Sequence, residues 1–174
     1  GGMGAYSPSR LINTQLEEKI LKKIIQPTLL GLSKLGTNYK GFLYAGLMIV
    51  KDEPYLIEYN VRMGDPECQT ILPKLQTNLT DILLACCNET LDKIVINWSD
   101  KKSICIVMCS KGYPDEFEKN IEIENLDNIK LDINENLFHA GTTKKDNKVY
   151  ATGGRVLNFV SISDNFAIAK NNII

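Results

Sequence analysis

The 174-residue chain lacks the features that mark several classes of protein. No apolar run approaches the roughly 18 residues that a membrane span requires. The chain holds 20 Lys and Arg residues against 21 Asp and Glu residues, for a formal net charge of −1. This balance gives no electrostatic basis for binding nucleic acid or a membrane, so we expect neither partner. A hydrophobic content of 44% instead indicates a globular protein with a substantial core.

Motifs for zinc binding, a Walker loop and a Ser-His-Asp triad are also absent. The five cysteines follow no metal-binding spacing. Cys86 and Cys87 lie in an apolar helical stretch, and Cys105 and Cys109 lie in a strand-like run. We therefore expect reduced thiols in a cytoplasmic protein, without a catalytic cysteine. The single histidine, His139, is expected to be structural.

Apolar periodicity predicts helices and strands in the first part of the chain. Asn13 or Thr14 should cap a helix that Pro27 breaks or kinks and that Gly36 closes. Residues 41–50 are apolar on both faces, as a central buried strand would be. A turn at 51–54 should join this strand in a hairpin to the one that follows.

The sequence pattern changes near residue 99, where we expect a boundary between two domains. Thr77 and Asn78 precede a predicted helix over Leu79–Cys87. Beyond residue 99 the pattern predicts strands and a final helix. These predicted elements are the strands at 103–109, 137–143 and 148–163 and the helix from about Asp164.

Residues 54–67, PYLIEYNVRMGDPE, contain polar side chains in strict alternation. Side chains alternate across a strand, so we expect Glu58, Asn60 and Arg62 to share one face with Leu56. Glu and Asn supply oxygen ligands to Mg²⁺, and Arg offers a planar fork to phosphoryl oxygens. The alternative is an exposed polar face of an edge strand. The apolar neighbouring strand, with Gly46 near its middle, favours a covered site with room for a ligand.

Two glycine-rich segments have two interpretations each. GGMGAYSP, residues 1–8, is either a flexible linker or a loop whose backbone N–H groups approach an anion. TGGR, residues 152–155, is either a hairpin with a surface Arg155 or a loop that brings this arginine to a phosphate.

Five segments together resemble one known family. GGMGAYSP, GFLYAGLM, IEYNVRMGDPE, FHAGT and TGGRV, in this order, are similar to the C-terminal half of the phosphoribosylamine–glycine ligases, also called glycinamide ribonucleotide synthetases. These enzymes belong to the ATP-grasp superfamily. The resemblance implies an α+β fold, with the C-terminal part of an ATP-grasp domain over residues 1–98. In this part an antiparallel sheet carries packed helices. A small β-rich C-terminal α+β domain, truncated at its end, follows over residues 99–174.

The resemblance also implies a reaction and its participants. Glycine would be ligated to 5-phosphoribosylamine through glycyl phosphate, with ATP and Mg²⁺, or Mn²⁺, as cofactors. The remainder of the same polypeptide, with the N-terminal and lid domains, would be the partner of this chain, so that the chain alone is an inactive fragment. The alternatives are another ATP-grasp carboxylate–amine ligase and a non-catalytic nucleotide-binding derivative.

The resemblance further assigns roles to single residues. Arg62 would be catalytic, Glu58 and Asn60 would hold the metal, and Leu56 would contact adenine. The substrate-binding residues would be Gly1, Gly2, Met3, Gly4, Gly64, Asp65, Pro66, Glu67 and Arg155.

Overall fold

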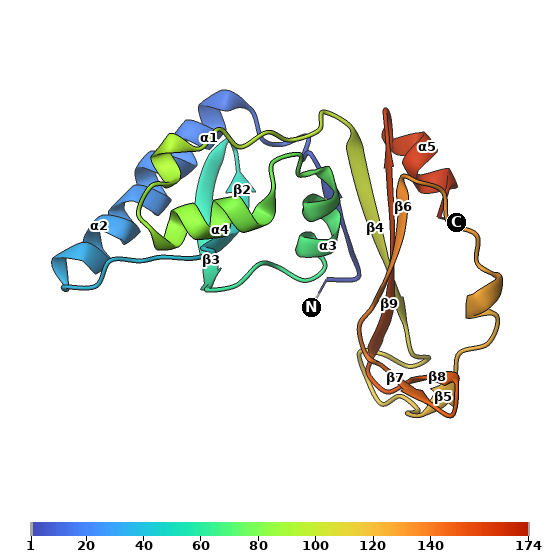
Figure 1. Ribbon diagram of the computed structural model, residues 1–174. Helices are drawn as coiled ribbons and strands as arrows, with labels where there is room; N and C mark the ends of the chain where they lie inside the picture. The colour runs from blue at the N-terminus through green and yellow to red at the C-terminus, as the bar shows by residue number, and fades with distance from the viewer. Residues whose placement is uncertain (1, 174) are drawn as a thin grey trace. The chain divides into compact units, whose positions relative to one another are not determined.

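Three antiparallel sheets and five α-helices make up residues 2–173, the part that the computed structural model describes (Figure 1). They form two compact units that are interleaved along the chain. Unit 1 contains the segment up to Ser7, Asp65–Lys74 and the residues from Ser99 onward, whereas unit 2 contains Pro8–Gly64 and Leu75–Trp98. The first domain expected from the sequence, residues 1–98, therefore contributes segments to both units.

Unit 2 consists of helices and one hairpin. Its elements are α1 (Thr14–Ile20), the π-helical η1 (Leu21–Ile25), α2 (Gln26–Lys34), β2 (Tyr44–Val50), β3 (Glu53–Asn60), α4 (Leu79–Cys87) and the 3₁₀ turn η3 (Leu91–Lys93). The expected caps are present, because Asn13 Oδ1 accepts from Leu16 N at 2.9 Å and Asn78 Oδ1 accepts from Thr80 N at 2.8 Å. Gly36, at φ +82°, follows the last helical turn as expected.

The sequence predicted that Pro27 breaks or kinks the first helix, and the structure shows no break there. α1, η1 and α2 follow one another without a gap, and Figure 1 shows them as a continuous blue rod. The five-residue π segment over Leu21–Ile25 lies directly before the proline. Pro27 lacks a backbone N–H and occupies the beginning of α2, where the changed hydrogen-bond pattern accommodates it.

The hairpin of β2 and β3 is confirmed, but β2 is not a central buried strand. The two strands form a sheet by themselves, joined by Lys51 and Asp52 at φ 51° and 59°. Met48 is 53% exposed and Val50 is 47% exposed. The apolar composition of residues 41–50 led to too high a prediction of burial, because composition does not show how many strands pair with β2 or what covers its faces.

Acidification should weaken the contact between the hairpin and α1. Glu53 binds Lys19 Nζ at 2.7 Å and Lys23 Nζ at 2.6 Å. The hydrogen bond from Lys19 has the largest effect on the pKa of Glu53, followed by that from Lys23. Together they lower this pKa from 4.5 to about 2. The contribution of these ion pairs to the free energy of unfolding should therefore be complete above pH 4.5, the pKa of the carboxyl in the unfolded chain. It should be lost as the pH falls through about 2, the pKa in the folded chain. Urea midpoints measured across this range should fall less steeply for Glu53→Gln; parallel curves for the two proteins would contradict the assignment.

Unit 1 is built on two sheets. Its elements are β1 (Gly4–Ser7), α3 (Glu67–Ile71), η2 (Leu72–Lys74), β4 (Lys102–Cys109), β5 (Ile121–Glu122), η4 (Leu126–Asn128), β6 (Glu135–His139), β7 (Thr142–Lys145), β8 (Lys148–Ala151), β9 (Arg155–Ser163) and α5 (Phe166–Asn171). The strand orders are β1-β4-β9-β6 and β5-β8-β7. Cys105, Val107 and Val160 form one buried cluster, and Ala151, Val156 and Leu157 form another.

The two long strands expected near the end of the chain are each divided. Residues 137–143 split between β6 and β7, and residues 148–163 split between β8 and β9. The divisions fall at Gly141 and at Gly153–Gly154, where the chain passes from one sheet to the other. Across residues 2–173, none of the helices has both the length and the apolar character needed to cross a membrane.

Candidate functional site

A β-bulge in β3 distributes the polar residues of this strand between the two faces of the hairpin. Gly46 is opposite Glu58, whereas the next residue of β2, Leu47, is opposite Leu56, so Ile57 is the additional residue. Residues directly opposite each other in antiparallel strands point to the same face. Glu58 and Leu56 therefore lie on opposite faces, and the expectation that they share one is wrong. The expected contact of Leu56 with adenine loses this geometric basis.

Glu58 and Asn60 do share a face. Asn60 Nδ2 donates to Glu58 Oε1 at 3.0 Å. Their face also carries Met48 and Tyr55, which are 53% and 57% exposed. On the other face, Tyr59 donates its hydroxyl to the backbone oxygen of Ile24 at 3.1 Å, which fastens the hairpin to the helix. The polar pair therefore lies on the open face and not in a covered sheet.

The arrangement of this pair suits a shared hard cation. A carboxylate and an amide in contact can direct two oxygen atoms at one ion, because rotation of the Asn60 amide exchanges Nδ2 and Oδ1. An open face leaves the remaining coordination positions to water and phosphate oxygens, which Mg²⁺ retains in most protein sites. Within residues 2–173, no group of three or more His, Cys, Asp or Glu side chains could hold a metal ion. A cation at Glu58 and Asn60 would complete its coordination with water and phosphate oxygens.

Gly46 serves the Glu58 side chain itself. A Cβ atom at this position would lie 3.1 Å from Glu58 Cγ. The space left by the missing side chain is therefore taken up by the stem of Glu58 as it crosses β2. This differs from the expectation that the space admits a ligand, although Gly46 still sets where the carboxylate lies.

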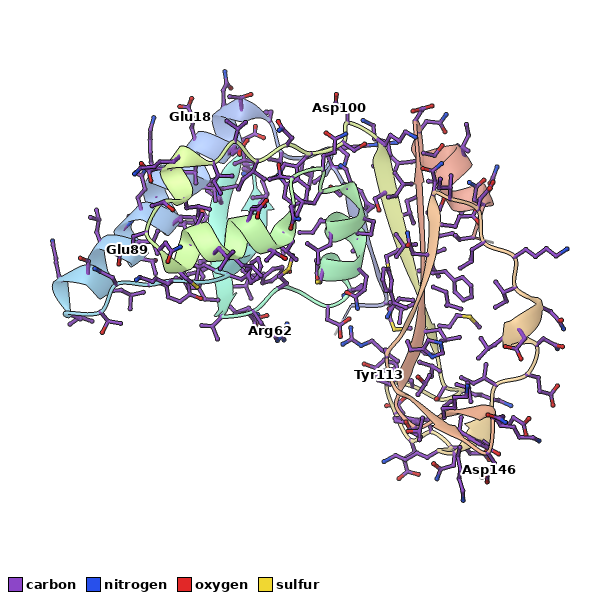
Figure 2. All side chains as sticks on the ribbon, in the orientation of Figure 1. Glu18, Arg62, Glu89, Asp100, Tyr113 and Asp146 are labelled. Carbon is purple, nitrogen blue, oxygen red and sulfur yellow. The ribbon has the colours of Figure 1, made fainter. Side chains whose placement is uncertain are left out.

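Arg62 lies just beyond the end of β3 and is exposed. Its Nη1 atom donates to the backbone oxygen of Met63 at 2.8 Å. Figure 2 shows Arg62 at the edge of its unit. The guanidinium therefore presents a planar set of N–H donors next to the strand that bears Glu58 and Asn60, as phosphate recognition requires.

A second group of expected site residues meets in unit 1. Arg155 Nη1 donates to the backbone oxygen of Asp65 at 2.8 Å and to that of Gly2 at 3.2 Å, and Nη2 donates to Asp65 Oδ2 at 2.7 Å. A Cβ atom at Gly2 would lie 3.3 Å from Pro66 Cδ. The structure therefore brings together residues from three segments that are distant in the sequence, namely Gly2, Asp65, Pro66 and Arg155. The sequence had left open whether the TGGR segment is a hairpin with a surface arginine or a loop that brings Arg155 to a phosphate.

The FHAGT and TGGRV segments contact each other through their backbones. Gly141 N donates to the oxygen of Arg155 at 2.9 Å, and Gly153 N donates to that of Gly141 at 3.0 Å. A Cβ atom at Gly141 would lie 2.6 Å from Gly153 Cα. Glycine is required there by this close approach, which holds the backbone of Arg155 at the beginning of β9.

Two residues that support this loop were missed from the sequence. Ser110 Oγ donates to the oxygen of Gly153 at 2.8 Å, and Ser110 N donates to that of Gly154 at 2.8 Å. The Tyr113 ring, whose residue is labelled in Figure 2, occupies the space over Gly154, so a Cβ atom there would clash with Tyr113 Cδ2. The Gly-Tyr-Pro sequence at 112–114 is typical of a turn, but it does not show which segment the turn packs against.

A buried lysine was also missed. Lys74 is 7% exposed, and its Nζ donates to the hydroxyl of Ser7, the last residue of β1, at 3.3 Å. Burial lowers the pKa of Lys74, and the nearby Lys102 lowers it further. The ammonium group therefore lies beside the strand that continues from the glycine-rich segment.

The remaining expected residues occupy defined places. Met3 accepts from Val107 N at 3.1 Å through its backbone oxygen. Gly4 begins β1, Gly64 is buried and Glu67 begins α3, while Gly1 lies outside the described residues.

The thiols near this group are poorly suited to nucleophilic chemistry. Burial raises the pKa of Cys105 to about 11, and it also raises the pKa values of Cys68 and Cys109. These thiols therefore remain protonated near neutral pH. None of the five cysteines, all of which lie within residues 2–173, forms a disulfide. His139 is exposed and contacts Thr142 Oγ1 through Nδ1 at 3.0 Å, which supports a local structural role.

The two groups of site residues lie in different units. Glu58, Asn60 and Arg62 belong to unit 2, and Gly2, Asp65, Pro66 and Arg155 belong to unit 1. The first group offers oxygen ligands and a cationic fork, and the second offers a glycine-rich backbone held by an ion pair.

Comparisons with known proteins match both parts of the chain. Residues 1–68 match the family model of the phosphoribosylglycinamide synthetase ATP-grasp (A) domain, and residues 103–174 match that of the phosphoribosylglycinamide synthetase C domain. A phosphoribosylamine–glycine ligase of Agrobacterium fabrum is 44% identical over 98% of this chain and 40% of its own length. The trifunctional purine biosynthetic protein adenosine-3 of Gallus gallus is 44% identical over 97% of this chain and 17% of its own.

A solved structure agrees with the fold. The crystal structure of phosphoribosylamine–glycine ligase from Thermotoga maritima matches with a TM-score of 0.82 and 32% identity, over 98% of this chain and 41% of that one. The chain spans about 40% of the length of the curated bacterial ligases described by the same comparisons. The α+β fold expected from the sequence is thus confirmed. The chain belongs to the phosphoribosylglycinamide synthetase family, with sequence from both its ATP-grasp and C domains.

Proposed function

We propose that the intact protein ligates glycine to 5-phosphoribosylamine at the expense of ATP. The carboxylate of glycine takes the γ-phosphoryl group of ATP, which gives glycyl phosphate and ADP. The amine of phosphoribosylamine then attacks the acyl carbon, and phosphate leaves as the amide of glycinamide ribonucleotide forms. Glycinamide ribonucleotide belongs to de novo purine biosynthesis, and cysteines without disulfides suit a cytoplasmic enzyme.

The observation that carries this proposal is the pair on the open face of the hairpin. Glu58 and Asn60 are in contact at 3.0 Å, and Arg62 follows on the same segment. All three lie within the stretch that matches an ATP-grasp domain. The alternation of carboxylate, amide and guanidinium thus coincides with the part of the family that handles the nucleotide.

The roles of these residues follow from their chemistry. Glu58 and Asn60 would hold Mg²⁺, or Mn²⁺, through their side-chain oxygens. The ion, when bound, neutralises charge on the phosphate oxygens. Arg62 would stabilise the charge on the phosphoryl group as it passes between the two anionic oxygens. Leu56 remains a candidate for adenine contact, now from the other face of the strand.

The substrate side would be formed by the group in unit 1. Gly2, Met3 and Gly4 would bring backbone N–H groups close to an anionic substrate. Asp65, Pro66 and Glu67, with Gly64 before them, would shape the turn beside it. The expected role of Gly1 stays a prediction.

ADP release by the intact protein tests the proposal. The assay contains ATP and Mg²⁺ and omits glycine or phosphoribosylamine in turn. Release that requires both substrates supports the ligase. Nucleotide binding without release in any combination would contradict it, and would favour a different carboxylate substrate or a non-catalytic derivative.

Glu58→Gln should weaken metal binding to the intact protein about 10–100-fold, since it removes one charged ligand. Titration with Mn²⁺, followed by its electron paramagnetic resonance signal, measures this without reference to turnover. Glu18→Gln is the matched control, because Glu18 is an exposed carboxylate of the same unit, paired with Lys22 at 3.1 Å. Equal affinity of the Glu58→Gln variant and the wild type would remove Glu58 from the metal site.

A further inference from the structure

Arg155 connects three segments of the chain through one guanidinium group. Its three hydrogen bonds reach Gly2 in the opening segment and the backbone and carboxylate of Asp65. Three of the five N–H groups of the arginine are therefore committed to the protein. A group with this many protein acceptors is arranged to hold its neighbours in place.

The backbone of Arg155 is held by hydrogen bonds to neighbouring segments of unit 1. Gly141 N donates to its carbonyl oxygen at 2.9 Å, and a register shift between Met108 and Cys109 places Arg155 opposite Cys109 in the sheet. Ser110 holds the preceding glycines. The position of the side chain is thus set by β4 and the FHAGT loop, independently of any ligand.

The burial of the contact agrees with this arrangement. The Arg155 side chain is 22% exposed, compared with 43% for Asp65. The carboxylate has a second anchor, because Asp65 Oδ1 accepts from Gln69 Nε2 at 3.0 Å. The ion pair between Arg155 and Asp65 therefore joins the opening segment, the turn at 64–66 (hereafter the Asp65 turn) and α3.

We infer that Arg155 is a positioning residue, which fastens the glycine-rich opening segment to the Asp65 turn and acts on the substrate side through these two segments. This inference rests on the proposed function for its effect on turnover. It replaces the expectation that the arginine binds substrate directly. A lysine at this position could still serve a phosphate as a point charge, although less well than the arginine fork, whereas it could not make the three bonds to Gly2 and Asp65.

Arg155→Lys and Arg155→Gln separate the two roles in the intact protein. Lysine keeps the positive charge but cannot make the three bonds of the fork. If Arg155 is a positioning residue, turnover should fall about 10-fold in both variants, since misplaced binding groups lower the rate. Retention of near wild-type turnover by Arg155→Lys, with loss in Arg155→Gln, would overturn the inference and favour direct contact.

Hydrogen exchange provides a readout that does not depend on turnover. Both variants should raise amide exchange about 10-fold in peptides covering residues 2–7 and 65–70, because the tie between them is lost. Asp65→Asn should raise exchange in residues 2–7 as well. Lys144→Gln, an exposed lysine of β7, should leave exchange unchanged. Unchanged exchange in the Arg155 variants would overturn the inference, even if the protein proves to have a different activity.

Discussion

Replacing Arg62 by glutamine should lower the turnover of the intact ligase about 10²–10³-fold, the usual effect of removing one preorganised donor to a developing charge. The side chain is exposed and donates to the backbone oxygen of its neighbour Met63. Its loss should therefore leave the melting temperature unchanged. The effect should appear in kcat, because the donor acts on charge that is greatest in the transition state.

Two companion variants make the Arg62 experiment specific. Arg62→Lys keeps the charge without the planar fork and should be intermediate in turnover. Lys34→Gln removes an exposed positive charge at the end of α2 in the same unit and should have no effect. Wild-type turnover in the Arg62→Gln protein would exclude Arg62 from catalysis.

Gly141→Ala should destabilise the chain by about 3 kcal/mol, at the upper end of the cost of overpacking a tight site. The added Cβ would lie 2.6 Å from both Arg155 O and Gly153 Cα, and 2.8 Å from Gly153 N. All three are backbone atoms, so no side-chain rotation can relieve the clash. For a chain of this size the melting temperature should fall by roughly 6–12 °C.

Gly31→Ala is the control of opposite sign. Gly31 lies inside α2, and a Cβ atom there would meet nothing within 4 Å. Alanine should stabilise this helix by about 0.5–1 kcal/mol, because it reduces the freedom of the unfolded chain. Thermal melts of the two variants test the prediction together. Equal stability of Gly141→Ala and wild type would contradict the contact between the FHAGT and TGGRV segments.

Local signals in the sequence predicted local structure well. Asn13 and Asn78 cap helices where expected, and the turn at Lys51 and Asp52 closes the expected hairpin. Each of these features depends on residues close in sequence, whose preferences act directly on the backbone. The break that was one alternative at Pro27 is absent, and a π segment occupies the preceding turn.

The sequence proposes the residues of the candidate site but does not show how they are arranged in space. A single additional residue at Ile57 reverses the face of Leu56 relative to Glu58. Alternation in a sequence cannot reveal such a bulge, because it depends on the partner strand. The contacts of Arg155 with Gly2 and Asp65 likewise join positions too distant for any local pattern to connect.

The interleaving of the two units has a consequence for the order in which the chain can fold during synthesis. The hairpin of β2 and β3 closes through a two-residue turn and can form as soon as it has been made. β1 precedes it, yet Gly4 pairs with Ile106 of β4, so this strand has no partner until far more of the chain exists. The glycine-rich segment therefore lacks its β4 partner throughout the synthesis of unit 2. The anchor at Arg155 is made later still, so the segment acquires its final contacts only when β9 emerges.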